Sequence, residues 1–488
     1  MKRLLGGVCA ALSLAACGTT VPLSAQGSVT SDGLGGNPTA GPAATAGSGA
    51  PGAGASATSS TTANGTGGSD GRPLPGTGSP SSSAPTSVPR ALPTGAAART
   101  PVNVGVMYSS GVDAAAKALG INGLTTGDTK AQAAAVFAWV NAHGGLGGHP
   151  LKPFYYDIPT TSGNPDTAAE QACTSLTQDS RIRFLITYVN LRPGSLPCFS
   201  KRGVAIIDDE AGVSAATMAK YAPYLAGPGD FSGDRQVKAL VDDLWSRGWL
   251  TSRSKVGSLA FDTADGAALV QGALKQALAA HGLALAADER VSSDASGISQ
   301  ASSVSLKFRA AGVDRIIPVN ASPLFVMENA SSQGYHPAYA MLSAFGPGAL
   351  METAAPKDQL VNSAGIGWQP YLDIGSGKHP GPVSSRETLC FDIMKKAGQV
   401  AGGATEKGFQ AQMCNMAFYL KAMTDALPAI PADILTASRP VIGATLPSAD
   451  TFRSDVTHRV DGVAGFRSLA YETSCSCFQY VSAVKATS

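Results

Sequence analysis

The feature that most constrains the fold is an alternation of short apolar runs with helical patterns, which begins near residue 100. Uninterrupted apolar runs separated by helices are typical of a parallel sheet that is covered on both faces. Strands are predicted at 102–108, 151–157, 184–189 and 204–207, with helices around 128–142 and 167–178. The sequence therefore predicts an α/β fold for this part of the chain.

The same pattern restarts after about residue 227. Predicted strands cover 255–261, 283–291, 314–320 and 338–342. Predicted helices cover 265–281, a segment that runs through 306–311, and a segment that ends at Gly334. Two successive α/β units predict two similar Rossmann-like lobes, each with its own parallel sheet.

The N-terminus has the pattern of an export signal. Lys2 and Arg3 precede an apolar run that ends in Leu14-Ala15-Ala16-Cys17. The run has about 13 residues, too few to span a bilayer, so residues 1–16 are predicted to be a signal peptide. The cut site resembles those of bacterial lipoproteins, which implies a diacylglycerol (and palmitate) anchor on Cys17. The alternative is an ordinary secretory signal with an incidental cysteine.

Residues 17–99 consist almost entirely of Gly, Ser, Thr, Ala and Pro, with no aromatic residue. Such a composition cannot bury enough apolar surface to offset the entropy of ordering the chain. We therefore expect a disordered tether that holds the folded part away from the membrane.

The composition excludes several classes of function. The formal net charge is +2, and no basic stripe with interleaved aromatic residues is present, so nucleic acid is not an expected partner. The six histidines are not spaced as metal-binding pairs, and no Gly-x-Ser-x-Gly motif follows a strand. We expect no enzymatic activity, no cofactor and no metal.

Six cysteines follow the tether, an even number that predicts disulfides in an exported domain. They are Cys173, Cys198, Cys390, Cys414, Cys475 and Cys477. Proximity in sequence favours pairing each cysteine with its neighbour. A pair that joins 475 to 477 needs a tight turn, because an extended strand holds such residues near the upper limit for bridging. A crossed pairing of 390 and 414 with 475 and 477 is the alternative.

Four local motifs occur in a characteristic order. They are the opening strand 102–110, the helix exit 139–151 (Trp-Val-Asn-Ala-His-Gly-Gly-Leu-Gly-Gly-His-Pro-Leu), Ala-Ala-Gly-Val-Asp at 310–314, and Gln-Gly-Tyr-His-Pro at 333–337. Together they resemble type I periplasmic binding proteins, in particular the branched-chain amino-acid-type substrate-binding subunits of ABC transporters. The resemblance covers roughly residues 100–488.

This resemblance implies two lobes joined by three crossovers, which close on a ligand by hinge motion. It implies that 100–226 and 352–448 form the first lobe, and that 227–351 and 449–488 form the second. The implied protein is a monomer that delivers a small polar solute to separate permease and ATPase subunits. The alternatives are a ligand-sensing receptor subunit and a cell-envelope interaction lipoprotein without a ligand.

Candidate ligand contacts are polar and aromatic residues at the carboxyl ends of predicted strands, where open α/β sheets bind ligands. They are Tyr108, Ser109, Ser110, Tyr188, Asn190, Asp208, Asp209, Phe261, Asp262, Thr263 and Asn320. Residues of these types also cap helices and form turns, so each of them could have such a structural role instead of contacting a ligand.

The chain departs from the amino-acid binders at two loops. Residues 189–194 replace the family's Ser/Thr-rich run, and Asp208-Asp209-Glu210 stands where an uncharged loop is usual. Three carboxylates near a cleft would repel a ligand carboxylate and favour a cation or a polyol, although Arg192 could reverse this locally. We therefore expect that simple branched-chain amino acids are not the main ligand.

Overall fold

A computed structural model describes residues 99–118, 124–158, 165–187, 195–209, 212–293, 296–375, 379, 381–442, 447–456 and 461–487. These residues belong to one compact unit. The predicted signal peptide, Cys17 and the tether up to residue 98 lie outside the described residues. No helix in the described ranges is long and apolar enough to cross a membrane.

The first sheet is entirely parallel and has the order β2-β1-β3-β4-β5. Its strands are β1 (Val102–Tyr108), β2 (Leu151–Asp157), β3 (Phe184–Thr187), β4 (Ala205–Asp208) and β5 (Leu225–Ala226). The helices between them are α2 (Val112–Ala118), α3 (Thr129–Ala142), α4 (Pro165–Thr174), which continues as a π-helix to Asp179, α5 (Leu196–Lys201) and α6 (Ala215–Tyr221). Every residue of β3 and β4 is buried, as expected for strands covered on both faces.

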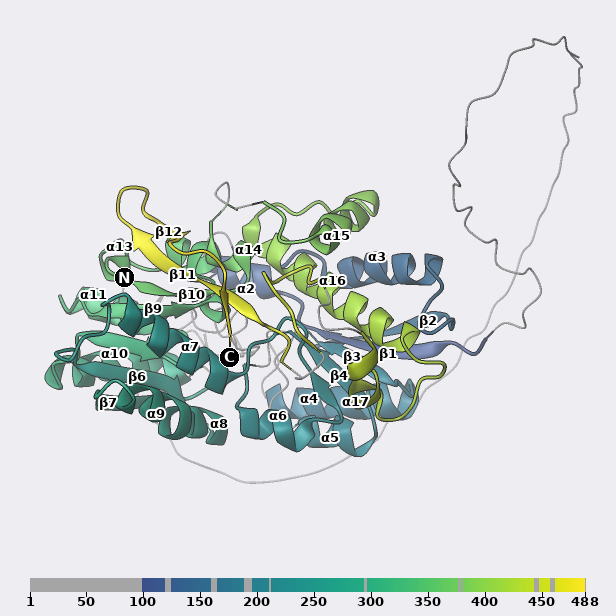
Figure 1. Ribbon diagram of the computed structural model, residues 1–488, viewed down its shortest axis with the longest axis horizontal. Helices are drawn as coiled ribbons and strands as arrows, with labels where there is room; N and C mark the ends of the chain where they lie inside the picture. Colours follow the sequence, from purple (N-terminus) through teal and green to yellow (C-terminus); the bar gives the residue numbers. More distant parts are fainter. Residues whose placement is uncertain are drawn as a thin grey trace, which may run out of the picture. The chain divides into compact units, whose positions relative to one another are not determined.

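The second sheet repeats this order as β7-β6-β8-β9-β10 and adds antiparallel strands (Figure 1). The parallel strands are β6 (Val256–Phe261), β7 (Leu285–Val291), β8 (Arg315–Pro318), β9 (Ala338–Leu342) and β10 (Ala364–Gly367). β11 (Gly465–Glu472), β12 (Cys477–Tyr480) and β13 (Lys485–Ala486) follow from the C-terminal segment. The predicted fold class, two α/β lobes with mostly parallel sheets, is confirmed.

Helices cover the second sheet as they cover the first. They are α7 (Gly233–Ser246), the helical stretch from α8 (Ala264–Ala268) through a π-helix to α9 (Lys275–Ala279), α10 (Ser296–Ala310) and α11 (Leu324–Ser332). Short helical turns at 343–345 and 347–351, α12 (Glu352–Ala354) and α13 (Lys357–Leu360) connect β9 to β10.

The boundary predicted at residue 352 is wrong, because residues up to Gly367 stay with the second lobe. β10 pairs parallel with β9 and antiparallel with β11. Gly365 permits this close pairing, since a Cβ there would lie 1.9 Å from the carbonyl oxygen of Met341. The chain returns to the first lobe only after β10.

The returning segment completes the first lobe. It consists of α14 (Pro370–Asp373), α15 (Ser385–Lys396), α16 (Ala404–Asp425), α17 (Ile434–Ala437) and α18 (Arg439–Ile442). α16 packs against α3 and α15, and its side chains are buried almost all around. The Cys390–Cys414 disulfide links α15 to α16, and Cys173–Cys198 links α4 to α5. The third pair in the structure joins Cys475 to Cys477, so the crossed alternative is not the one formed.

α2 connects the two lobes by packing. Val112, Ala115 and Ala116 belong to the same apolar cluster as the core of the second lobe, although β1, which precedes them, is in the first sheet. Figure 1 shows α2 between the two sheets. The segment that follows β1 is therefore held by both lobes.

Candidate functional site

The candidate site is the set of polar and aromatic residues at the carboxyl ends of equivalent strands in the two sheets. β1 and β6 occupy the same position in their sheets, so Tyr108 and Phe261 end equivalent strands. Both side chains are half-buried. Burial, together with the nearby carboxylates of Asp157 and Asp128, raises the pKa of Tyr108. Its hydroxyl therefore remains a neutral hydrogen-bond donor at physiological pH.

Two of the predicted contacts in the first lobe fix the loop after β1. The Ser109 Oγ donates a hydrogen bond to the Ile158 carbonyl at 2.6 Å. The backbone N–H of Ser110 donates to Asp157 Oδ1 at 2.8 Å. These bonds tie the end of β1 to the end of β2 and leave the Ser110 side chain exposed. Tyr188 and Asn190 lie outside the described residues.

In the second lobe, Thr263 and Asn320 have structural partners. Thr263 caps α8, since its Oγ1 accepts a hydrogen bond from the Gly266 N–H at 3.0 Å. Asn320 Oδ1 accepts from the Phe261 N–H at 3.0 Å, which joins the ends of β8 and β6. Asp262 lies between these groups with an exposed side chain. Of the predicted ligand contacts at the ends of β6 and β8, Thr263 and Asn320 hold the local backbone in place, whereas Asp262 is exposed to solvent.

Asp208 ends β4 and Asp209 follows it, but both side chains are buried. Their exposed fractions are 1% and 3%. Asp209 Oδ1 accepts from the Gly229 N–H at 2.7 Å, and its Oδ2 accepts from Asn415 Nδ2 at 2.9 Å. Since both carboxylates are buried, the structure does not support the expectation that they repel an anionic ligand. Glu210 and Arg192, the other charges in that argument, lie outside the described residues.

Asp209 belongs to a buried polar cluster where the chain passes between the lobes. We name these passages the first crossing (227–232, from β5 to α7), the second crossing (368–369, from β10 to α14) and the third crossing (447–456 and 461–464, before β11). The crossing cluster comprises Asp208, Asp209, Asp230, Asn415, Asp450 and Asp461, all buried. Only Asp208 and Asp209 of this cluster stand at a predicted strand end in the sequence.

Asn415 connects β4 to the third crossing. Its Nδ2 donates to Asp209, and its Oδ1 accepts from Ser448 Oγ at 3.0 Å and from the Ala449 N–H at 3.3 Å. The second crossing joins through Gln369, whose Nε2 donates to Asp450 Oδ2 at 3.0 Å. The cluster therefore links all three crossings.

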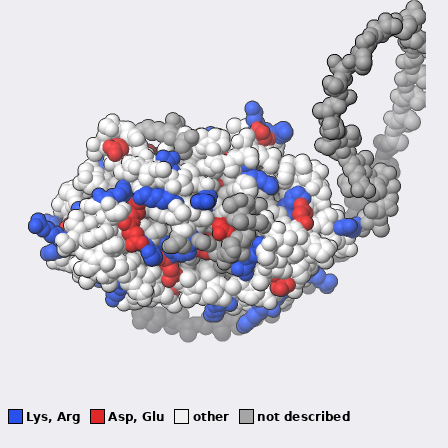
Figure 2. All heavy atoms as spheres, viewed as in Figure 1, with Lys and Arg blue, Asp and Glu red and all other residues white. Residues whose placement is uncertain are grey.

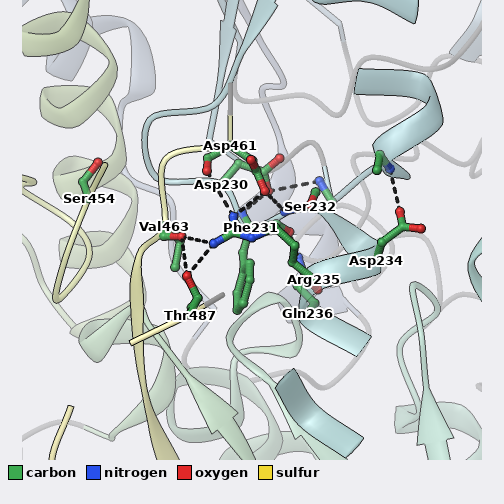
Figure 3. A network of polar contacts seen from close by, with 12 residues as sticks. Asp230, Phe231, Ser232, Asp234, Arg235, Gln236, Ser454, Asp461, Val463 and Thr487 are labelled. Atoms are coloured by element: carbon green, nitrogen blue, oxygen red, sulfur yellow. Dashed lines mark hydrogen bonds and ion pairs between the residues drawn. The ribbon is translucent and has the colours of Figure 1, made fainter. Parts of the chain in front are cut away.

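The first and third crossings lie side by side (Figure 3). The Gly462 N–H donates to the Gly227 carbonyl at 2.7 Å, and the Val463 N–H donates to the Asp230 carbonyl at 2.9 Å. Asp461 Oδ2 accepts from the Ser232 N–H at 3.0 Å and forms an ion pair with Arg235 at 2.5 Å. Backbone pairing and a charge-assisted bond thus hold these two crossings together.

Burial and neighbouring carboxylates perturb the acids of the cluster. Burial, with Asp208 and Asp461 nearby, raises the pKa of Asp230 to about 8. Burial and the adjacent Asp450 also raise the pKa of Asp209 well above its usual value. Asp230 Oδ1 accepts from the Gly212 and Phe231 N–H groups, whereas its Oδ2 has no hydrogen-bond partner within the described ranges. Asp230 is accordingly neutral at pH 7.

Comparison with known proteins identifies the family. Residues 120–461 match the family model described as periplasmic binding protein. Direct comparison with curated protein sequences gives no significant match. A match over more than half of the chain shows that it belongs to the periplasmic binding protein family. It is an extracytoplasmic solute-binding protein and not an enzyme.

Solved structures of low sequence identity share the fold. A Rhodopseudomonas palustris ABC transporter solute-binding protein in complex with 4-hydroxybenzoate is similar at a TM-score of 0.57 and 13% identity, covering 79% of this chain and 97% of the other. A Thermus thermophilus branched-chain amino acid ABC transporter protein with bound valine is similar at a TM-score of 0.57 and 15% identity. The match covers 80% of this chain and 98% of the other. A Desulfitobacterium hafniense substrate-binding protein in complex with Leu is similar at a TM-score of 0.53 and 11% identity. The match covers 78% of this chain and 100% of the other.

The crossing cluster predicts a pH dependence of stability. The pKa of Asp230 is about 8 in the folded protein and near 3.8 in the unfolded chain, where the carboxyl group is exposed to water. The folded state therefore binds the proton more tightly. The resulting stabilisation is complete below about pH 4 and is lost as the pH rises to about 8. We predict that Asp230→Asn flattens the decline in unfolding free energy between pH 5 and 8 by up to about 1 kcal/mol per pH unit. Urea denaturation at a series of pH values measures this slope.

Asp392→Asn is the matched control, because Asp392 is an exposed carboxylate on α15. This variant should keep the slope of the wild-type protein. An unchanged slope in Asp230→Asn as well would contradict the assignment of a neutral Asp230.

Proposed function

We propose that this chain is a lipid-anchored solute-binding protein that captures a small polar ligand between its lobes and delivers it to an ABC permease. The observation that carries the proposal is the pair of equivalent parallel sheets joined by three buried crossings, because this arrangement permits hinge closure. The ligand would lie at the carboxyl ends of the strands, near Tyr108, Ser110, Phe261 and Asp262.

Neutral and anionic ligands both remain within the proposed class. Two of the three acids predicted to oppose an anion, Asp208 and Asp209, are buried in the crossing cluster. The solved structures of this fold contain 4-hydroxybenzoate and valine, which both carry a carboxylate group. Partly buried aromatic side chains beside hydroxyl and amide groups also suit a small ligand with an apolar part.

The surface agrees with a role in binding a small solute. Figure 2 shows basic and acidic side chains next to one another on the visible face, which does not suggest a nucleic-acid surface. For delivery, the solute-loaded protein would dock on separate permease and ATPase subunits, as the family resemblance implies.

A thermal-shift screen tests the ligand proposal. Residues 18–488 are screened against amino acids, amides, polyamines, sugars, short peptides and aromatic carboxylates. A ligand present at about 100 times its Kd stabilises the folded state by about 2.7 kcal/mol and raises the melting temperature. We predict that at least one class gives such a shift, and that Tyr108→Ala or Asp262→Ala lowers the affinity at least tenfold, measured by calorimetry.

Asp392→Ala removes an exposed carboxylate on α15 and should bind the same ligand with unchanged affinity. Equal affinity in all three variants would show that the ligand lies elsewhere. No shift with any class would contradict solute binding and favour the alternative of an envelope protein without a ligand.

The lipid anchor is tested separately from ligand binding. The full chain is expressed in a bacterium that processes lipoproteins, and is labelled with an alkyne fatty acid. We predict that the wild-type protein incorporates the label and enters the membrane fraction, and that Cys17→Ser does neither, because the acceptor sulfur is absent. Cys9→Ser, which changes the other cysteine of the signal region, should be labelled normally. Labelling of Cys17→Ser would refute the anchor.

A further inference from the structure

The turn between β11 and β12 contains a disulfide between residues only two positions apart. Cys475 and Cys477 flank Ser476, whose φ of 50° lies in the left-handed region. A residue other than glycine adopts this conformation at a cost in free energy. The disulfide therefore closes a small ring around a constrained residue, at the end of the hairpin seen in yellow in Figure 1.

The other two disulfides are embedded in the helical layers of the first lobe. They span 25 and 24 residues and each joins two helices. Cys173, Cys390 and Cys414 are all 0% exposed. Because the stabilisation by a disulfide grows with the length of the loop it closes, the Cys475–Cys477 bond contributes least to the stability of the fold.

The sulfur atoms at the turn are arranged for exchange with a thiol. Cys475 is partly exposed, whereas Cys477 is 4% exposed. Gln479 Nε2 lies 3.2 Å from Cys475 Sγ and 3.5 Å from Cys477 Sγ and can donate to either. A hydrogen-bond donor beside a sulfur stabilises its thiolate form and makes it a better leaving group.

We propose that the Cys475–Cys477 disulfide is a thiol–disulfide exchange site for a low-molecular-weight thiol. The thiolate of one such molecule attacks the accessible Cys475 Sγ, and the bond to Cys477 breaks with its electron pair. Cys477 leaves as a thiolate beside Gln479. A second thiolate then attacks the small-molecule sulfur of the mixed disulfide and releases Cys475.

The exchange is balanced in atoms and electrons. Two thiol molecules supply two electrons and two protons, and they leave as one small-molecule disulfide. The protein takes up the electrons and protons as the two thiols of Cys475 and Cys477. The reverse reaction oxidises the site again, and no other reactant takes part.

Partial reduction with glutathione tests the proposal, with the other two disulfides as internal controls. Residues 18–488 are incubated with increasing glutathione under native conditions, quenched with an alkylating agent, and mapped by peptide mass spectrometry. We expect Cys475 and Cys477 to be alkylated at least tenfold faster than the Cys173–Cys198 and Cys390–Cys414 pairs. Reduction of either control pair first, or of all three together, would overturn the proposal.

Cys173–Cys198 is the stricter control. Cys198 is partly exposed, and Arg202 Nη1 lies 2.6 Å from its Sγ, so this bond also has a donor beside a sulfur. Faster reduction at Cys475 would thus show the effect of the small ring and not only of a nearby donor.

A variant separates exchange chemistry from local unfolding. Gln479→Leu removes the donor from an exposed position on β12 and should slow the reduction of Cys475–Cys477 severalfold. Gln333→Leu, on the C-terminal side of α11, should leave that rate unchanged. An unchanged rate in Gln479→Leu would overturn the assigned role of Gln479. The measurements need no ligand, so they are independent of whether the solute screen succeeds.

Discussion

The structure depends on how buried polar groups find partners where the chain passes between its two lobes. An unpaired polar group is costly in a low-dielectric interior, so most buried polar groups are hydrogen-bonded. At the crossings, carboxylates accept the N–H groups of Gly229 and Ser232, and Asn415 joins Asp209 to Ser448. The crossing cluster therefore fixes where the two sheets meet the linking segments.

This cluster also changes the interpretation of the ligand site. A run of acids after β4 would favour a cationic or polyhydroxy ligand if it faced a cleft. Asp208 and Asp209 are instead buried, and Asp209 accepts hydrogen bonds from Gly229 and Asn415 in the crossing cluster. The accessible candidates at strand ends are neutral or carry a single charge, as Ser110 and Asp262 do. The two buried acids therefore give no guide to the charge of the ligand.

The parts of the fold that could be predicted from sequence are those with strong local patterns. The apolar run Phe184–Thr187 was predicted as a strand from its local pattern, and it forms a fully buried strand. β10 was missed because Ala364–Gly367 is short and half glycine, and its strand conformation depends on pairing with β9 and β11. α16 lacks a polar face because it is buried on most sides, so its pattern gives no amphipathic period.

The sequence could predict which residues end the strands, but not which of them are held by distant parts of the chain. The strand-end pattern predicted Asp209 as a ligand contact, whereas its hydrogen-bond partner Asn415 is 206 residues away in sequence. No local pattern indicates such a contact, so a buried linking acid and a ligand contact have the same appearance in the sequence. Thr263 shows the same ambiguity on a smaller scale, because a residue that follows a strand can equally cap the next helix.

The measurement that most directly tests this account is amide hydrogen exchange of the wild-type protein, Asn415→Ala and Asn329→Ala. If the cluster joins the crossings into one unit, Asn415→Ala should accelerate exchange at Ala449 and also at Gly229 and Gly462, whose amides donate to Asp209 and to the Gly227 carbonyl and not to Asn415. Asn329→Ala, which removes a side-chain bond within α11, should leave these amides unchanged. Acceleration confined to Ala449 would contradict the account, because the crossings would then open independently.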